Sequence, residues 1–514
     1  MPTTSENNKR IAKNTLLLYM RMIFLMLISL YTSRVVLNAL GVENYGIYNV
    51  VGGVVAMFSF VSGSLSGAIS RFTTFELGRG NIEKLKTVFS TSVTIQLCIS
   101  VVFILLAETV GLWFLNTKMN IPEERLFAAN IVLHLSVFSF IVGLISVPYN
   151  ASIIAHEKMS AFAYISIVEA VFKLGVAILI TMSPIDVLIF YAILLAFVSL
   201  IIRLIYGIYC KRHFEECTYH FTLDKPLLKE MTGYAGWTFF GSTAYLFNTQ
   251  GVNMLINLFF DVTVNAARGV AVRVNAIVVQ FINNFMMAIN PQITKSYARG
   301  DLDYMHILMC RSAKFSSFLM FLLAVPIVIE APLILKLWLI NPPEYAAIFV
   351  QLTFLGTFID NVLGGNLVVA MQATGHVRRY QTIVASIGTA VFFGTWLVFW
   401  LGFPPQSTYI VFTVVYTVLL FVRLWLLRDM VKLSRMMYVR EVLFRVIPVL
   451  ILSFILPLIV KSFMSPGFLR LVCVCLVSLP VTAALSYYLG MTANEKVFIQ
   501  EKVISKITSK FKHK

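Results

Sequence analysis

The chain has 514 residues, of which 59% are hydrophobic and 13% are charged, and its formal net charge is +17. A soluble domain carries about 25% charged residues, so this composition excludes an ordinary soluble protein. A large positive charge can indicate nucleic-acid binding, but here the basic residues lie between long apolar segments, which excludes that class. The six cysteines show no metal-ligand spacing, so we expect reduced packing residues, no metal and no cofactor.

Fourteen apolar segments of about 20 residues follow one another along the chain. Such a segment crosses the ~30 Å hydrocarbon core as a helix, because lipid offers the backbone no hydrogen-bond partner. The sequence therefore predicts an all-α polytopic membrane protein with about 14 transmembrane helices. The predicted spans are 15–40, 46–70, 87–114, 126–147, 161–182, 184–209, 234–259, 264–290, 306–330, 346–371, 379–402, 406–428, 441–463 and 467–490.

The loops between these spans alternate in charge. With a cytoplasmic N-terminus, 28 of the 41 Lys and Arg residues lie in cytoplasmic segments and five lie on the opposite side. Cytoplasmic loops of membrane proteins carry an excess of Lys and Arg. We therefore predict a multi-pass protein of the inner (cytoplasmic) membrane with both termini in the cytoplasm. The five outer residues are Lys118, Arg125, Lys336, Lys461 and Arg470.

A weak internal repeat relates the two halves of the chain. Arg79-Gly80-Asn81 recurs as Arg299-Gly300-Asp301, and His156 recurs as His376, both at an offset of 220. Six helices per repeat give both halves the same topology, with a pseudo-twofold axis along the membrane normal. We predict a first lobe over 1–210 (spans one to six), a second lobe over 211–432 (spans seven to twelve), and spans thirteen and fourteen with a basic, lipid-associated tail over 433–514.

Four arginines lie inside predicted spans, two in span one and two in span eight. A charged side chain in a membrane helix usually faces a cavity or a partner. No acidic residue lies inside spans one, two, seven or eight, so a cationic cavity between the lobes is predicted. Such a cavity favours an anionic substrate, and the planar guanidinium fork suits phosphate. The arginines are Arg21, Arg34, Arg268 and Arg273.

Spans seven and eight are also unusually rich in amides. A helix that is polar on two faces is expected to line a wet cavity rather than to meet lipid. The alternative is hydrogen bonding between helices without a role in binding. The amides predicted to bind substrate with the arginines are Asn253, Asn257, Asn275, Gln280 and Asn284.

Three other ionisable residues lie near mid-membrane and are candidates for ion coupling. Glu169 and Lys173 are four residues apart on one helix face, and they can also be a self-neutralised pair without a role in transport. Asp360 in span ten is the preferred candidate, because Glu169 already has a neutralising neighbour. Arg423 is expected to extend towards the membrane surface. No ATP-binding loop of the Gly-rich type is present, and we expect no enzyme activity.

The stretch from Arg34 to Tyr48 reads RVVLNALGVENYGIY. It resembles the first periplasmic turn of bacterial polysaccharide exporters, in which an arginine of span one precedes the pattern LG-x-x-x-YG-x-Y. The segments 71–80 and 224–237 and the pair Gly375-His376 are similar too. Over essentially its whole length, the chain resembles the O-antigen and capsular polysaccharide flippases of the multidrug/oligosaccharidyl-lipid/polysaccharide exporter superfamily.

This resemblance implies transport of an undecaprenyl-diphosphate-linked oligosaccharide from the cytoplasmic to the periplasmic leaflet by alternating access between two lobes. It implies the polysaccharide polymerase and the glycosyltransferases of the same pathway as partners. Two alternatives share the superfamily, a lipid II flippase and a multidrug or cation antiporter. A membrane-embedded glycosyltransferase or polymerase is a third, but the outer loops near 115–125 and 331–345 are short for one.

Overall fold

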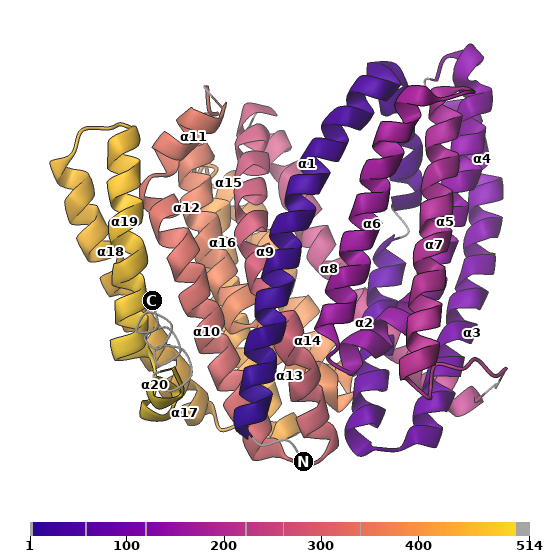
Figure 1. Ribbon diagram of the computed structural model, residues 1–514. Helices are drawn as coiled ribbons and strands as arrows, with labels where there is room; N and C mark the ends of the chain where they lie inside the picture. The colour runs from indigo at the N-terminus through magenta and orange to yellow at the C-terminus, as the bar shows by residue number, and fades with distance from the viewer. Residues whose placement is uncertain are drawn as a thin grey trace, which may run out of the picture. The chain divides into compact units, whose positions relative to one another are not determined.

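The computed structural model describes residues 4–56, 59–118, 121–221, 224–260, 262–339 and 341–499, and within these ranges it contains helices and no strand (Figure 1). The helices are α1 (Thr4–Ala56), α2 (Ser59–Arg79), α3 (Ile82–Leu106), α4 (Leu112–Lys118), α5 (Glu123–Ala155), α6 (Met159–Leu179), α7 (Val187–His213), α8 (Lys225–Phe259), α9 (Val262–Ala298), α10 (Leu302–Ile329), α11 (Ala331–Leu339), α12 (Ala346–Thr357), α13 (Gly365–Thr374), α14 (Val377–Gly388), α15 (Ala390–Trp400), α16 (Ser407–Val431), α17 (Arg435–Tyr438), α18 (Phe444–Phe463), α19 (Phe468–Leu485) and α20 (Ala493–Ile499).

The predicted fold class is confirmed. Among the described residues, twelve helical segments are long and apolar enough to cross a membrane. They match twelve of the fourteen predicted spans. The other two, spans two and seven, are helical but fall outside the twelve, because α2 is rich in Ser and Gly and α8 carries several amides.

Helix α1 covers the first predicted span and part of the second. Its backbone leaves the helical conformation at Gly41, with φ 72° and ψ 168°. A side chain at positive φ is strained, so glycine fits this position. Gly41 lies inside the segment 34–48, so the chain changes direction where the sequence predicts the first periplasmic turn.

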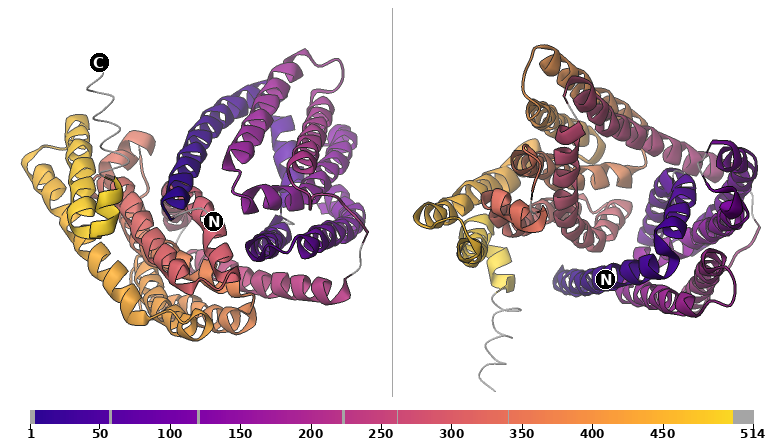
Figure 2. Two further views of the ribbon diagram at one scale, coloured as in Figure 1. Left: turned by 60° about the horizontal axis from the view of Figure 1, so that its bottom comes forward. Right: turned by 90° about the horizontal axis from the view of Figure 1, so that it is seen from above.

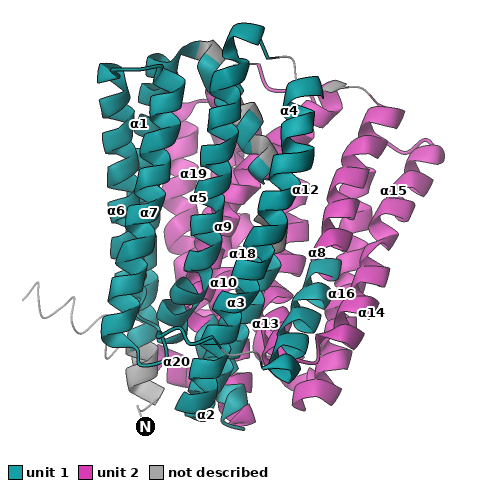
Figure 3. Ribbon diagram, turned by 90° about the vertical axis from the view of Figure 1, so that its right-hand side faces the viewer, with its two compact units in different colours: residues 1–240, 290–300 teal, residues 241–289, 301–514 magenta. Residues whose placement is uncertain are grey.

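The chain divides into two compact units, shown in two colours in Figure 3. Unit 1 comprises residues 1–240 and 290–300. In it, α5 packs along α7 and against α2 and α3, and α1 packs along α6. Its apolar core contains Val51, Phe103, Val132 and Leu188, all with at most 3% of their surface exposed. The core thus joins α1, α3, α5 and α7.

Unit 2 comprises residues 241–289 and 301–514. Helix α10 packs against α13, α18 and α19, and α16 packs against α12, α13, α14 and α15. The C-terminal pair α18–α19 lies beside α10 (Figure 2). The predicted limits of the lobes at 210 and 432 describe an internal repeat rather than packing, so they stay a prediction.

The repeat has a local counterpart in the backbone. Gly80 and Gly300 both take a left-handed conformation, with φ of 74° and 76°. The next residue caps the following helix in both places: the Asn81 side chain accepts from the Lys84 amide, and the Asp301 side chain accepts from the Tyr304 amide. A left-handed glycine followed by an Asn or Asp cap is therefore used twice, 220 residues apart.

Candidate functional site: a polar cavity in each unit

Unit 1 encloses a cavity of about 470 Å³ between α1, α6 and α7. Three predicted site residues, Arg21, Glu169 and Lys173, line it together. The Lys173 Nζ donates to Glu169 Oε1 at 2.6 Å, so these two charges neutralise each other. The Arg21 guanidinium lies 4.4 Å from the centre of the Phe162 ring. The cavity therefore carries an excess of positive charge from Arg21.

The remaining wall of this cavity is rich in hydroxyl groups. Its lining includes Tyr45, Tyr48 and Tyr191. A second cavity of about 300 Å³ shares Tyr48 and Lys173 with the first. Hydroxyl groups both donate and accept hydrogen bonds, so the two cavities offer many partners to a polyhydroxylated ligand. The small hydroxyl residues that line one or the other are Ser29, Thr32, Ser33, Ser136, Ser139, Ser166 and Ser199.

Unit 2 encloses a smaller cavity of about 170 Å³ between α8, α9, α12 and α16. Two predicted residues, Arg268 and Asn275, line it. The Arg268 Nη2 donates to the Thr249 carbonyl at 3.2 Å, and the Thr357 hydroxyl donates to Asn275 Oδ1 at 3.0 Å. Among the described residues that line this cavity, Arg268 is the only charged one. The positive charge of this lining therefore comes from one residue, and the predicted cationic cavity between the lobes stays a prediction.

The other predicted binding residues line none of these three cavities. The Arg34, Arg273, Asn257 and Gln280 side chains are exposed, and Asn284 is buried. Asn253 makes two hydrogen bonds: its Nδ2 donates to Gln250 Oε1 at 3.0 Å, and its backbone carbonyl accepts from Asn265 Nδ2 at 3.2 Å. The Asn253 side chain is thus bonded within α8, and only its backbone carbonyl takes part in a contact between α8 and α9. A role in binding for these residues stays a prediction.

The preferred coupling residue, Asp360, lies in a π-helical turn, Phe358–Leu363, next to the cavity of unit 2. Both terminal nitrogens of Arg423 donate to Asp360 Oδ1 at 3.1 Å. The expectation that Arg423 extends to the membrane surface is wrong, because only 5% of its surface is exposed. Asp360 therefore has a neutralising partner, as Glu169 has, and the reason for preferring it over Glu169 disappears.

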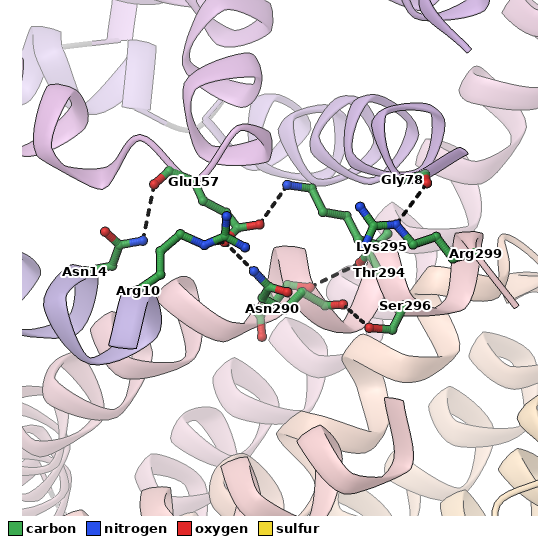
Figure 4. Close-up of polar contacts among 10 residues, drawn as sticks. Arg10, Asn14, Gly78, Glu157, Asn290, Thr294, Lys295, Ser296 and Arg299 are labelled. Carbon is green, nitrogen blue, oxygen red and sulfur yellow. Dashed lines mark hydrogen bonds and ion pairs between the residues drawn. The ribbon is translucent and has the colours of Figure 1, made fainter. Parts of the chain in front are cut away.

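A cluster around Glu157 was not predicted from the sequence. Its carboxylate contacts Arg10, Gln292 and Lys295 within unit 1 (Figure 4). Glu157 belongs to a predicted loop between two spans, and Lys295 to another. These two residues are 138 positions apart, so a sequence pattern gives no sign that they meet.

Two buried ion pairs of unit 2 were missed for the same reason. Lys314 Nζ donates to Glu495 Oε2 at 2.9 Å, and Arg470 Nη2 donates to Glu330 Oε2 at 2.8 Å. In the described part of the chain, no group of three or more His, Cys, Asp or Glu residues is placed to hold a metal ion.

Comparisons with solved structures place this fold among known transporters. A MATE transporter in the bent conformation matches with a TM-score of 0.72 and 13% identity over 84% of this chain and 98% of that chain. An outward-facing multidrug resistance MATE family transporter of the MOP superfamily matches with a TM-score of 0.70, at 13% identity over 83% and 96%. A MOP superfamily transporter from Pyrococcus furiosus with a binding pocket of reverse polarity matches with 0.67, 13%, 83% and 96%.

At these identities the structural matches show the fold alone. A comparison with curated protein sequences gave no match. The sequence model of the family described as "Polysaccharide biosynthesis protein" matches residues 11–297, which is more than half of the chain. The protein therefore belongs to the polysaccharide biosynthesis protein family and has the fold of the MOP superfamily transporters.

Proposed function

We propose that the protein translocates an undecaprenyl-diphosphate-linked oligosaccharide from the cytoplasmic to the periplasmic leaflet of the inner membrane, for the synthesis of a surface polysaccharide. The observation that carries the proposal is the family membership together with an arginine in each unit's cavity. The transport is by alternating access between two lobes, and the protein itself makes and breaks no covalent bond.

The chemistry of the cavities suits the parts of such a substrate. A diphosphate is an anion, and an arginine in a low-dielectric site attracts it more strongly than in water. The hydroxyl-rich wall in unit 1 suits a sugar, and its volume of about 470 Å³ lies in the usual range of ligand sites. The polyprenyl tail is as apolar as lipid and stays in the bilayer while the headgroup crosses.

The direct test uses purified protein in liposomes that contain a fluorescent undecaprenyl-diphosphate glycan. A membrane-impermeant quencher reports the fraction of headgroups in the outer leaflet over time. We expect headgroup movement that depends on the protein and slows in an Arg268→Gln variant. Headgroup movement that is no faster in liposomes with the protein than in protein-free liposomes would contradict the proposal.

The same liposomes discriminate the alternatives. Lipid II carries the same diphosphate with a different glycan, so faster movement of lipid II than of the other glycans would favour a lipid II flippase. A cationic drug is disfavoured beside Arg268. Uptake of such a drug against an ion gradient, with no movement of any lipid-linked glycan, would favour the antiporter. In cells, deletion of the gene should cause the lipid-linked glycan to accumulate and surface glycan to disappear.

A further inference from the structure

A fully buried carboxylate lies in the turn that joins α5 to α6. The Glu157 side chain has none of its surface exposed. Lys295 Nζ donates to Glu157 Oε1 at 2.7 Å, Arg10 Nε forms an ion pair with Oε2 at 2.9 Å, and Gln292 Nε2 donates to the same oxygen. Both carboxylate oxygens are thus occupied, which is the condition for a buried charge to be tolerated.

The groups around this carboxylate come from distant parts of the chain. Arg10 and Asn14 belong to the start of α1, and Gln292 and Lys295 belong to the end of α9 (Figure 4). Asn14 Nδ2 also donates to the Glu157 carbonyl at 3.2 Å. One residue therefore connects the α5–α6 turn to the ends of two helices. We call Glu157, Arg10, Gln292 and Lys295 the Glu157 cluster.

The end of α9 is held a second time, by the end of α2. Arg299 Nε donates to the Gly78 carbonyl at 3.3 Å. A Cβ atom at Gly78 would lie 2.9 Å from Ala298 Cβ and 3.0 Å from Lys295 Cα. Only glycine allows the two helices to approach this closely, because any side chain would collide with the α9 backbone. This second contact involves no carboxylate, so it can be tested independently of Glu157.

Helix α9 is span eight of the predicted second lobe, whereas α1, α2, α5 and α6 belong to the predicted first lobe. Under the predicted orientation, all the contacts described above lie at the cytoplasmic ends of these helices. A cluster that satisfies a buried charge has two discrete arrangements, formed or separated and hydrated, rather than a continuous range.

We propose that the Glu157 cluster is a lock on the cytoplasmic side. It holds the end of α9 against α1, α2 and the α5–α6 turn while the cavity of unit 1 is closed to the cytoplasm. The cluster separates when this cavity opens to the cytoplasmic side. The proposal rests on the proposed function only in its use of alternating access, and it does not depend on the identity of the substrate.

The experiment measures access to the cavity of unit 1 from the cytoplasmic face. Ser29 is exposed, lines this cavity and lies near the middle of predicted span one. In a protein whose six native cysteines are replaced, Ser29→Cys reports access to a membrane-impermeant maleimide in inside-out vesicles. We expect Glu157→Gln to raise the labelling rate of the cysteine at position 29 by about tenfold. This increase corresponds to a modest shift from the closed towards the open state.

Three further variants test whether the contacts act together. Lys295→Gln should raise the labelling rate as Glu157→Gln does, and the double variant should add little to either, because both remove one interaction. Gly78→Ala should give the same increase without removing any charge. Its matched control is Gly67→Ala, in the same helix, since a Cβ atom at Gly67 meets nothing within 4 Å. The control for Glu157→Gln is Glu83→Gln, whose carboxylate is 86% exposed.

Protein abundance and thermal unfolding are measured for every variant, so that a misfolded protein is recognised. Unchanged labelling from the cytoplasmic face in both Glu157→Gln and Gly78→Ala, at normal abundance, would overturn the proposal. An equal increase in the two control variants would overturn it too. The labelling is done without substrate, so its outcome is independent of whether a lipid-linked oligosaccharide is the cargo.

Discussion

At the scale of single residues, the Arg21 cavity of unit 1 and the Arg268 cavity of unit 2 carry their positive charge differently. In unit 1, Arg21 shares a cavity with the ion pair of Glu169 and Lys173, so a carboxylate lies in the same lining. In unit 2, the described residues that line the cavity of Arg268 include no carboxylate, and the Arg268 guanidinium donates to the Thr249 carbonyl. An anion that enters the cavity of unit 2 therefore meets a guanidinium that no carboxylate among the described lining residues neutralises.

We expect Arg268→Gln to reduce headgroup movement by about thirtyfold or more, because the loss of one partner of a buried charged contact commonly costs about 2–5 kcal/mol. Arg268→Lys should retain part of the activity, since it keeps the charge but loses the planar fork. Arg212→Gln is the control, because Arg212 is an exposed residue at the end of α7. Full movement with Arg268→Gln, at normal abundance, would remove Arg268 from the binding site.

The pair of Asp360 and Arg423 gives a second prediction. Asp360→Asn leaves a guanidinium buried without its counter-charge, so we expect a loss of about 3–5 kcal/mol in stability. Arg423→Met combined with Asp360→Asn should recover much of the loss, because no unpaired charge remains. Thermal unfolding in detergent measures both effects.

The double variant also tests the coupling hypothesis. If Asp360 couples transport to an ion, the folded double variant should move substrate at a rate that no longer responds to a proton or Na⁺ gradient. A full response to the gradient would exclude Asp360 and leave the pair of Glu169 and Lys173 as the candidate.

At the scale of helices, polar contacts decide how neighbouring elements are fixed. Lipid is as apolar as leucine, so burial alone does little to hold membrane helices together. The pair α18–α19 shows this. Arg470 of α19 binds Glu330 at the end of α10, and Lys461 Nζ of α18 donates to the Ile329 carbonyl at 2.7 Å. Both helices of the pair are thus anchored at one point of α10.

We expect Glu330→Gln to loosen the pair α18–α19, because the Glu330 side chain is fully buried and Arg470 would lose its counter-charge. Hydrogen exchange should rise in α18 and α19 and stay unchanged in α5 and α7. Glu344→Gln, in the loop before α12 and outside any ion pair among the described residues, is the control. Equal exchange of α19 in both variants would show that the ion pair does not anchor it.

At the scale of the whole molecule, the distribution of Lys and Arg predicts the topology. We expect cysteines at positions 9 and 514 to react only from the cytoplasm, and cysteines at 43, 122 and 404 to react in intact cells. Position 514 lies outside the described residues. Labelling with a membrane-impermeant maleimide before and after lysis is the measurement. Reaction at position 122 only after lysis would reverse the orientation.

Hydropathy was enough to predict the fold, because a helix in lipid must be apolar along its length and twelve of the fourteen spans were found as such. It was less decisive for spans two and seven, where polar and small residues lower the signal. The cavities could be predicted only in part. Arg21, Glu169, Lys173, Arg268 and Asn275 do line cavities. The partner of Asp360 could not be predicted because it is 63 residues away, nor could the partners of Glu157, of which Gln292 is 135 and Lys295 is 138 residues away.

Glu157 and its partner Arg10 distinguish the first half of this chain from the second half. Adding 220 to its number gives Val377, and adding 220 to Arg10 gives Glu230. The second half therefore has an apolar residue where the first has the carboxylate, and an acid where the first has the guanidinium. If the halves arose by duplication, they have specialised at this point. Exchanging residues between the halves would show whether one copy can take over the other's task.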